Sequence, residues 1–267
     1  RKGFEGAQDW DLNLRFSEQI AESEICHIPR VLYHWRSVEG STGADLANKP
    51  YVQKASIAAV NEHLRRTGQS ESALCATNPL QRGAYRVVRH LPEEPKVSII
   101  ILTRDGLDVL KKCIDSILSK TAYANYEILL VDNGSKEPQT LDYFETLKGN
   151  KSIRILPMDI PFNFSRLNNR AVDHANGEII ALVNNDIEVI EKGWLLEMVA
   201  QVMRKDVGCV GARLLYPNES LQHGGVILGI GGVAGHAHKY ASPEQGGYFG
   251  RIKVVQELSA VTAACML

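Results

Sequence analysis

Apolar runs of strand length alternate with amphipathic segments of helix length from residue 96 onward, and this alternation limits the fold more than any other feature of the chain. The run VSIIIL, which starts at Val97, is typical of a strand buried on both faces of a parallel sheet. Strands are also predicted in EILLV, SIRIL and EIIALV, with helices over 141–147, 165–175 and 194–204. A first helix is predicted from apolar residues with helical spacing: Leu107, Leu110, Cys113, Ile114, Ile117 and Leu118. Repeated βαβ units predict a three-layer α/β/α sandwich around a mostly parallel sheet.

The first ninety residues lack this alternation and predict a partial domain of helices and a short strand. Helices are predicted over 8–21 and over Pro50–Arg66, where a proline in the first turn and Gly68 after the last turn mark the ends. Between them, IPRVLYHWR, from Ile28, alternates as a strand does. A polar, turn-rich segment, SESALCATNPLQRG, and a short strand in AYRVV follow. The proline-bounded LPEEP indicates a linker, which divides the chain into domains 1–93 and 94–267.

The composition argues against several classes of protein. A formal net charge of −1 offers no electrostatic attraction to nucleic acid. The five cysteines form no CxxC pair, which argues against a zinc cage and a disulfide framework and favours a reducing compartment. No apolar run reaches the ~18 residues of a transmembrane helix, and no signal peptide is recognisable. We therefore expect a cytoplasmic globular protein, either free or peripheral at the inner face of the membrane.

Polar residues follow three of the predicted strands, at the edge where open α/β sheets bind their ligands. They are Thr103, Arg104 and Asp105 after the first strand, Asp132 after the second, and Asn184, Asn185 and Asp186 after the fourth. An acid at a strand end accepts hydrogen bonds from ribose or a base, and an acid beside a pyrophosphate needs a divalent cation. Each residue taken alone is also a common turn former. Three such strand ends together favour a nucleotide-sugar site.

Four segments resemble glycosyltransferase family 2 proteins of the GT-A fold: KVSIIILTRDGLDVLKKCIDSIL, YEILLVDNGS, FSRLNNRAVDHANGEIIALVNND and GWLLEMV. The resemblance covers 96–267 and is most specific for the tandem-domain members found in bacterial polysaccharide and O-antigen clusters. It implies an inverting, metal-assisted transfer from a nucleotide-diphosphate sugar donor to a saccharide or lipid-linked saccharide acceptor. The cofactor that it implies is Mn²⁺ or Mg²⁺.

The resemblance also implies roles for individual residues. Asp132 matches the acid that holds the nucleoside, and Leu102-Thr103-Arg104 stands where the family usually has Pro-Thr-Tyr. Asn169 and Gly177 match the family's Arg-Asn…Ala-x-Gly stretch, with Asn168 in place of the arginine.

The segment Asn184-Asn185-Asp186 resembles the family's metal-binding Asp-x-Asp, of which only the last acid is retained. The two asparagines are expected to contact the nucleotide sugar, and Asp186 is expected to bind the metal. Because a hard divalent ion prefers carboxylate oxygens, the loss of one acid weakens this metal site. An amide carbonyl and the donor phosphates also coordinate such an ion, so the site is not lost.

Residues 1–90 resemble the other, acceptor-side end of such a domain. The segment QDWDL matches the family's Glu-Asp-x-Asp-Leu element, which makes Asp9 the general base that deprotonates the acceptor hydroxyl. Asp11 is interpreted as a helix-surface or capping acid. The segment VLYHWR resembles the part that closes over the diphosphate, so Arg36 is expected to meet phosphate and His34 the metal. Two aromatic residues in it are expected to pack in a core: Tyr33 and Trp35.

The acceptor-side resemblance precedes the nucleotide-binding resemblance in this chain, whereas in the family the nucleotide half comes first. The chain is therefore predicted to contain the end of one domain and the start of a second, whose own catalytic helix is expected beyond Leu267. The lack of an initiator Met and the apolar end VTAACML agree with this expectation. Two arrangements stay open. Either the chain is inactive alone, or 1–90 docks on the second half as a circular permutation and brings Asp9 to Asp186.

Other functions have less support. A non-catalytic nucleotide-sugar-binding module stays open, because the Asp-x-Asp is incomplete. A nucleotidyltransferase would carry a glycine-rich, basic loop after the first strand, and LTRDG has one glycine and one arginine. The segment GIGGVA, from Gly229, matches a dinucleotide fingerprint, but GHAHK follows where a helix should begin. His223, His236 and His238 lack the spacing of a known zinc site.

Overall fold

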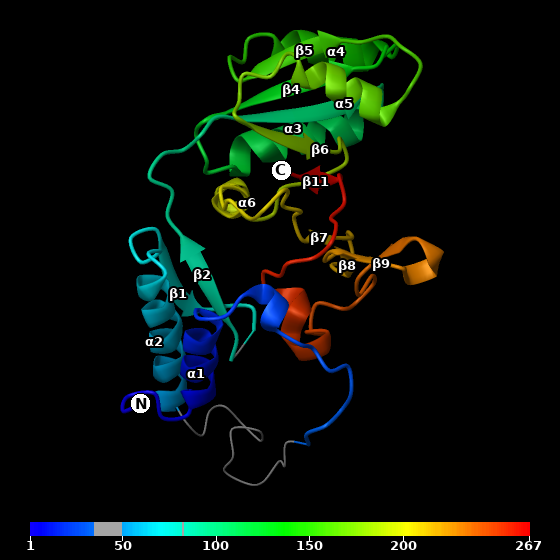
Figure 1. The fold of residues 1–267 in the computed structure, drawn as a ribbon. Coiled ribbons are helices and arrows are strands. Elements are labelled where there is room, and N and C mark those ends of the chain that lie inside the picture. The colour runs from blue at the N-terminus through cyan, green and yellow to red at the C-terminus, as the bar shows by residue number, and fades with distance from the viewer. Residues whose placement is uncertain (35–49, 82) are drawn as a thin grey trace. The chain divides into compact units, whose positions relative to one another are not determined.

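The computed structural model describes residues 1–34, 50–81 and 83–267, which form two compact units. The first unit comprises Arg1–His90 and Gly246–Gln256, and the second comprises Leu91–Gln245 and Glu257–Leu267. Figure 1 labels the helices and strands of both. No helix in the described part of the chain is long and apolar enough to cross a membrane.

The first unit contains two α-helices and a β-hairpin. Its elements are α1 (Gln8–Ser17), the 3₁₀ turn η1 (Glu22–Glu24), α2 (Pro50–Arg66), β1 (Ala73–Thr77), β2 (Tyr85–Arg89) and the 3₁₀ segment η4 (Tyr248–Lys253). Strands β1 and β2 are antiparallel, with Leu74 opposite Val88. The amide of Cys75 donates to Asn61 Oδ1 at 2.8 Å, which attaches β1 to α2.

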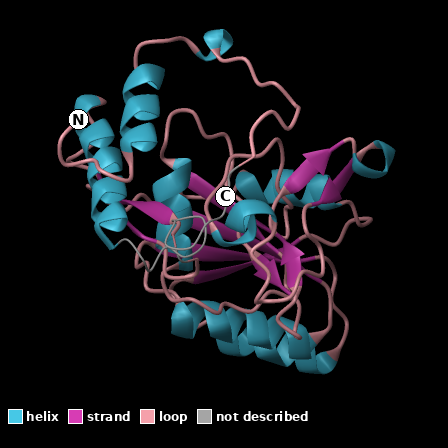
Figure 2. Ribbon diagram, turned by 90° about the horizontal axis from the view of Figure 1, so that it is seen from below, coloured by secondary structure: helices cyan, strands magenta, loops and turns pink. Residues whose placement is uncertain are grey.

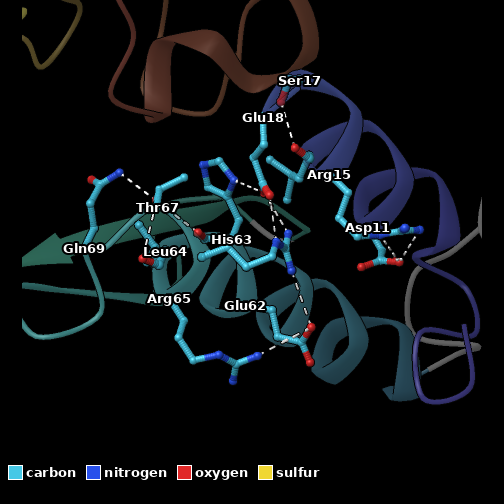
Figure 3. Close-up of polar contacts among 12 residues, drawn as sticks. Asp11, Arg15, Ser17, Glu18, Glu62, His63, Leu64, Arg65, Thr67 and Gln69 are labelled. Atoms are coloured by element: carbon cyan, nitrogen blue, oxygen red, sulfur yellow. Dashed lines mark hydrogen bonds and ion pairs between the residues drawn. The ribbon is translucent and has the colours of Figure 1, made fainter. Parts of the chain in front are cut away.

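Charged side chains hold α1 against α2 (Figure 3). The carboxylate of Glu18, just after α1, lies 2.7 Å from His63 Nδ1 and accepts two bonds of 2.8 Å from Arg66, and both partners are on α2. These bonds, from Arg66 first, lower the pKa of Glu18 to about 2. Asp11 is 2% exposed and is paired with Arg1 at 3.4 Å and Arg15 at 3.2 Å. The prediction of a helix-surface acid at Asp11 is therefore wrong, because the acid is buried among arginines.

Two other predictions for the first unit are wrong. Residues 28–34 form no strand, and Tyr33 is 81% exposed rather than packed in a core. An alternating segment becomes a strand only where a partner strand pairs with it, and within the described residues 28–34 have none. Conversely, the turn-rich segment contains β1, because pairing with β2 buries Ala73 and Cys75. Trp35 lies outside the described residues.

The second unit is an α/β sandwich, which confirms the predicted fold class. Its sheet has the strand order β11-β6-β3-β4-β5. The four parallel strands are β3 (Val97–Thr103), β4 (Tyr126–Asp132), β5 (Ile153–Pro157) and β6 (Ile179–Val183). The apolar chain end adds the short strand β11 (Cys265–Met266), which pairs antiparallel with β6. The sheet is therefore mostly parallel, with one antiparallel edge.

Helices cover both faces of this sheet (Figure 2). They are α3 (Leu107–Lys120), α4 (Pro138–Leu147), α5 (Phe164–Val172) and α6 (Trp194–Val202). Because side chains alternate along a strand, Ile99 and Ile101 of β3 face one core, together with α3, α4 and α6. Ile100 faces the other core, which contains Leu167 and Ala171 of α5. Each core thus lies between the central sheet and the helices on one of its faces, as in a three-layer fold.

Short antiparallel pairs follow α6 in the second unit. They are β7 (Leu214–Leu215) with β8 (Leu221–His223), and β9 (Val226–Leu228) with β10 (Ala234–His236). The segment GIGGVA forms the tip of the β9–β10 hairpin, around the 3₁₀ turn η3 (Ile230–Gly232). The glycines of this tip, Gly229, Gly231 and Gly232, all have positive φ. The fingerprint therefore lies in a hairpin tip, a different geometry from the strand-to-helix turn that holds a dinucleotide.

Candidate functional site

The structure brings three of the predicted strand-end residues together. Strands β3 and β4 are parallel neighbours, and Thr103 is in register with Asp132. From the other side, Asn185, in the loop after β6, donates from Nδ2 to Thr103 Oγ1 at 3.3 Å. Thr103 itself is 3% exposed, so its hydroxyl positions Asn185 rather than facing solvent. The carboxyl-terminal edge of the sheet therefore carries a continuous polar row over β6, β3 and β4.

Asp132 is placed to accept a hydrogen bond from a ligand. Its Oδ1 accepts from the amide of Ser135 at 2.8 Å, which closes a tight turn through Gly134 with φ 79°. Among the described residues, Oδ2 accepts no hydrogen bond, and the side chain is half-buried. One carboxylate oxygen therefore shapes the loop, and the other accepts no bond from the part of the chain that the structure describes.

Two residues that the sequence reasoning missed support this loop. Asn133 is 3% exposed and donates from Nδ2 to the carbonyls of Met158 and Ile160, each at 2.8 Å. This bond pair brings the segment after β5 against the end of β4. Asp159 follows in that segment, and its Oδ1 lies so close to Gly134 that a Cβ there would be 2.5 Å away. The signal in the sequence was the Asp-Asn-Gly run directly after a strand, which is typical of a constrained turn.

Asp105 is engaged by its own loops. Its Oδ1 accepts from the amides of Lys136 at 2.7 Å and Glu137 at 2.8 Å, and its own amide donates to Ser135 Oγ. The amides of Glu137 and Lys136 lower the pKa of Asp105. The residue thus joins the loop after β3 to the loop after β4, and Arg104 beside it is exposed. The expected contacts of Asp105 and Arg104 with the donor stay predictions.

The loop after β6 holds Asp186 at the surface. The amide of Asn184 donates to Ala264 O at 2.9 Å, and Asn184 O accepts from the amide of Ile187 at 3.3 Å and from Cys113 Sγ of α3 at 3.6 Å. Burial, and then the charge of Asp186, raise the pKa of Cys113 to about 12. Asp186 itself is exposed. The donor set at this tip is therefore one accessible carboxylate flanked by two amide side chains.

This donor set fits a divalent ion that is shared with a ligand, not an ion that the protein encloses. Among the described residues, no three His, Cys, Asp or Glu side chains cluster as a metal site. Mg²⁺ is commonly held by one or two carboxylates together with substrate phosphates, and it keeps several waters. A single carboxylate at a strand end satisfies that requirement only when a diphosphate supplies further oxygens.

A pocket of about 250 Å³ opens beside these residues, between β3, β6 and α5. Three asparagines line it: Asn168, Asn184 and Asn185. The remaining lining residues are apolar: Ile100, Leu102, Phe162, Phe164, Leu182 and Val183. Asn168 is 6% exposed and donates from Nδ2 to Phe164 O at 2.9 Å, one turn back on α5. Helical spacing places 164 and 168 on one face, whereas Asn169 is exposed and does not line the pocket.

The site residues that the sequence predicts within 1–90, where the structure describes them, belong to the first unit. Asp9 is exposed on α1, and its Oδ1 accepts from the amide of Trp10 at 2.9 Å. His34 is exposed in an irregular segment, and Arg36 lies outside the described residues. Since Asp9 and Asp186 belong to different units, the docking of the two halves stays a prediction.

Two of the three histidines considered for zinc form a pair. Nδ1 of His223 lies 2.9 Å from Nδ1 of His236, and the amide of Thr262 donates to His223 Nε2 at 3.4 Å. His223 is 1% exposed, and burial, followed by the neighbouring His236, lowers its pKa to about 4. The pair therefore connects β8, β10 and the segment before β11.

Comparison with known proteins gives matches along the whole chain. A family model described as "Glycosyl transferase family 2" matches residues 98–244. The uncharacterized protein y4gI of Sinorhizobium fredii is 49% identical over 269 residues, which is 100% of this chain and 29% of that protein. The O-antigen biosynthesis protein RfbC of Myxococcus xanthus is 39% identical over 269 residues, again 100% of this chain but 20% of that protein. The chain thus spans less than a third of the length of either relative.

Solved structures resemble part of the chain. A mannosyltransferase from Pyrobaculum calidifontis, in complex with GDP-Man and Mn²⁺, is 20% identical with a TM-score of 0.42, over 47% of this chain and 37% of that one.

Proposed function

Since the chain belongs to glycosyltransferase family 2, we propose that it transfers a sugar from a nucleotide-diphosphate donor to a hydroxyl of a saccharide acceptor in the synthesis of a cell-surface polysaccharide. One observation carries the proposal: the polar row at the carboxyl ends of β6, β3 and β4, where Asn185, Thr103 and Asp132 are adjacent. The similarity to an O-antigen biosynthesis protein supports a polysaccharide acceptor.

The donor's nucleoside is assigned to Asp132. Its Oδ2 accepts no hydrogen bond among the described residues, and ribose hydroxyls and base N–H groups are donors that it would bind. A hydrogen bond to a charged acceptor contributes about 1.5–3 kcal/mol. The turn through Ser135 and Gly134 holds this carboxylate in place before the donor arrives.

The donor's diphosphate is assigned to the loop after β6, where Asp186 would hold Mn²⁺ or Mg²⁺ together with phosphate oxygens. When bound, the ion supplies positive charge that stabilises the leaving nucleotide diphosphate. Asn184 and Asn185, which directly precede Asp186, would then contact the donor. This role needs no second carboxylate, because the donor completes the coordination.

The acceptor hydroxyl is assigned to Asp9. In an inverting transfer the hydroxyl oxygen forms a bond to the anomeric carbon as the bond from that carbon to the diphosphate oxygen breaks, and the hydroxyl proton goes to the Asp9 carboxylate. This residue is exposed on α1, which leaves it accessible to an acceptor. Asp9 serves this donor site if the two units dock, and serves a preceding domain if they do not.

Titration calorimetry of UDP, GDP and dTDP, with and without Mn²⁺, tests the donor site. Asp132→Asn is expected to weaken nucleotide binding about tenfold, as the loss of a charged hydrogen bond predicts. Asp186→Asn is expected to remove the gain in affinity that Mn²⁺ provides. The matched control is Glu188→Gln, a neighbouring acid that is 62% exposed and should leave both values unchanged.

The outcome also separates the alternatives. Failure to bind any of the three nucleotides would contradict the proposal. Binding that is independent of metal and unaffected by Asp186→Asn would instead favour a non-catalytic nucleotide-sugar-binding module.

A further inference from the structure

We propose that the pocket between β3, β6 and α5 selects the donor sugar, and that this sugar is uncharged with an apolar edge, as in a 6-deoxyhexose. The inference rests on the proposed function and adds the class of sugar to it. Two of the residues that line the pocket, Asn184 and Asn185, were predicted from the sequence to contact the donor, whereas its apolar lining was not predicted.

The lining of the pocket has two kinds of surface. Aliphatic side chains form one part, among them Ile100, Leu102 and Leu182, and two phenylalanines form the rim. Phe162 is 70% exposed and Phe164 is 38% exposed, so their rings are available to a ligand. Carboxamides supply the polar part. A pocket of this kind fits a ring that presents C–H groups on one side and hydroxyls on the other.

Among the residues that the structure describes, no charged side chain lines the pocket. The two positions at which the chain departs from the charged residues of the family pattern, Asn168 for arginine and Asn184 for the first acid, both line it. A positive and a negative group are thus missing from the same cavity, and each is replaced by a neutral amide. A carboxylate or ammonium on the sugar would lose water here without gaining an opposite charge, which is costly.

The size and place of the pocket point to the sugar rather than to the nucleoside. A volume of about 250 Å³ lies below the ~300–1,000 Å³ of pockets that enclose a drug-sized ligand, so one ring enters and the rest of the donor stays outside. Asn184 and Asn185 of the lining directly precede Asp186, the residue assigned to the diphosphate. Asp132, assigned to the nucleoside, lies on β4 and does not line the pocket. Because the nucleoside is assigned to Asp132, the ring that enters this pocket beside the diphosphate is the donor sugar.

Matched pairs of nucleotide sugars test the inference by calorimetry on the full chain with Mn²⁺. UDP-glucose and UDP-glucuronate differ in a charged carboxylate, and we expect the glucuronate to bind at least about tenfold more weakly. GDP-D-mannose and GDP-D-rhamnose differ only in the 6-hydroxyl, as do dTDP-D-glucose and dTDP-6-deoxy-D-glucose. In both pairs we expect the 6-deoxy sugar to bind about tenfold more tightly. The UDP pair tests the exclusion of charge, and the GDP and dTDP pairs test the preference for a 6-deoxy edge.

Phe162→Lys adds a cation at the pocket rim on a side chain exposed enough to tolerate it. This variant is expected to raise the affinity for UDP-glucuronate relative to UDP-glucose about tenfold. Leu141→Lys is the matched control, because Leu141 is 42% exposed on α4 and does not line the pocket. It should leave the ratio unchanged.

Equal or tighter binding of the glucuronate by the unaltered chain, or 6-deoxy sugars that bind no better than their hydroxylated partners, would overturn the inference while leaving the proposed function intact. A chain that binds none of the free nucleotides would overturn the proposed function and the inference together.

Discussion

Glu127 is a buried charged residue in the sheet of the second unit. It is 6% exposed at the start of β4, and its carboxylate accepts from Ser98 Oγ of β3 at 2.7 Å and from Arg154 of β5 at 3.3 Å. Asn176, in the turn before β6, donates its amide at 2.8 Å and its side chain at 3.0 Å. One side chain thus connects β3, β4, β5 and the turn before β6, at the edge opposite the candidate site.

The contribution of Glu127 to the stability of the second unit follows from the difference between its folded-state and ordinary pKa values. Burial alone would raise the pKa of Glu127, but the amide of Asn176, the hydroxyl of Ser98 and the charge of Arg154 together lower it to about 2 from 4.5. A difference of that size corresponds to roughly 3 kcal/mol of folding free energy. Because the folded-state pKa is lowered, the contribution is complete above about pH 4.5 and is lost as the pH falls towards 2.

Glu127→Gln removes the charge and presents an amide N–H₂ group to donors that need an acceptor. At pH 7 we expect the free energy of unfolding to fall by roughly 3 kcal/mol, which lowers the Tm of a unit of this size by about 6–12 °C. Thermal and urea unfolding followed by circular dichroism measure both. Glu145→Gln is the control, because that side chain is 66% exposed on α4 and should change stability by less than about 0.5 kcal/mol.

Two results would refute this reasoning. One is a Glu127→Gln variant within about 0.5 kcal/mol of the original chain at pH 7. The other is a difference between the two proteins that does not shrink between pH 5 and pH 2. Below its Tm the variant should still bind nucleotide, because Glu127 lies at the far ends of the strands.

Further predictions concern other parts of the molecule. Gly177→Ala should lower the free energy of unfolding by about 1–3 kcal/mol, because a Cβ there would lie 2.5 Å from the amide nitrogen of Ser98. Gly149→Ala is the control, because a Cβ at that position meets open space, and equal Tm values for the two variants would contradict the explanation. Glu18→Gln should lower the Tm of the first unit at pH 7, and most of this difference should disappear near pH 2, where the carboxyl of the original chain is about half protonated. His223 should titrate near pH 4 in an NMR experiment, so that its neutral form favours folding above about pH 6.5 and this preference is lost towards pH 4; a midpoint near 6.5 would disprove its burial against His236.

Much of the second unit was predictable because its signals are local. Continuous apolar runs marked β3 and β4, and helical spacing marked α3 and α6, whose Leu195 and Val199 are buried. In the first unit, the predicted bounds of α2, Pro50–Arg66, are confirmed. In each case a few neighbouring residues carry the pattern, and the fold only has to bury it.

Predictions failed where structure depends on residues far apart in the chain. Residues 28–34 alternate but have no partner strand among the described residues, whereas Ala73–Thr77 looks like a turn region and is a strand because β2 pairs with it. The chain end VTAACML gave no sign of β11, which exists because β6 offers a free edge. Strand pairing is decided by the partner, which local periodicity does not reveal.

The sequence by itself determined the α/β class, the order of strands and helices, and the polar residues at the strand ends, because side-chain period and turn chemistry are properties of adjacent residues. Only the tertiary structure decided what those residues do next to one another. In the folded protein, Asp105 accepts hydrogen bonds from the backbone of the loop after β4, and one oxygen of Asp132 accepts no bond from the described residues. Asn168, rather than Asn169, lines the same pocket as Asn184. Hydrogen bonds and burial join atoms that are distant along the chain, so their partners appear only when the chain is folded.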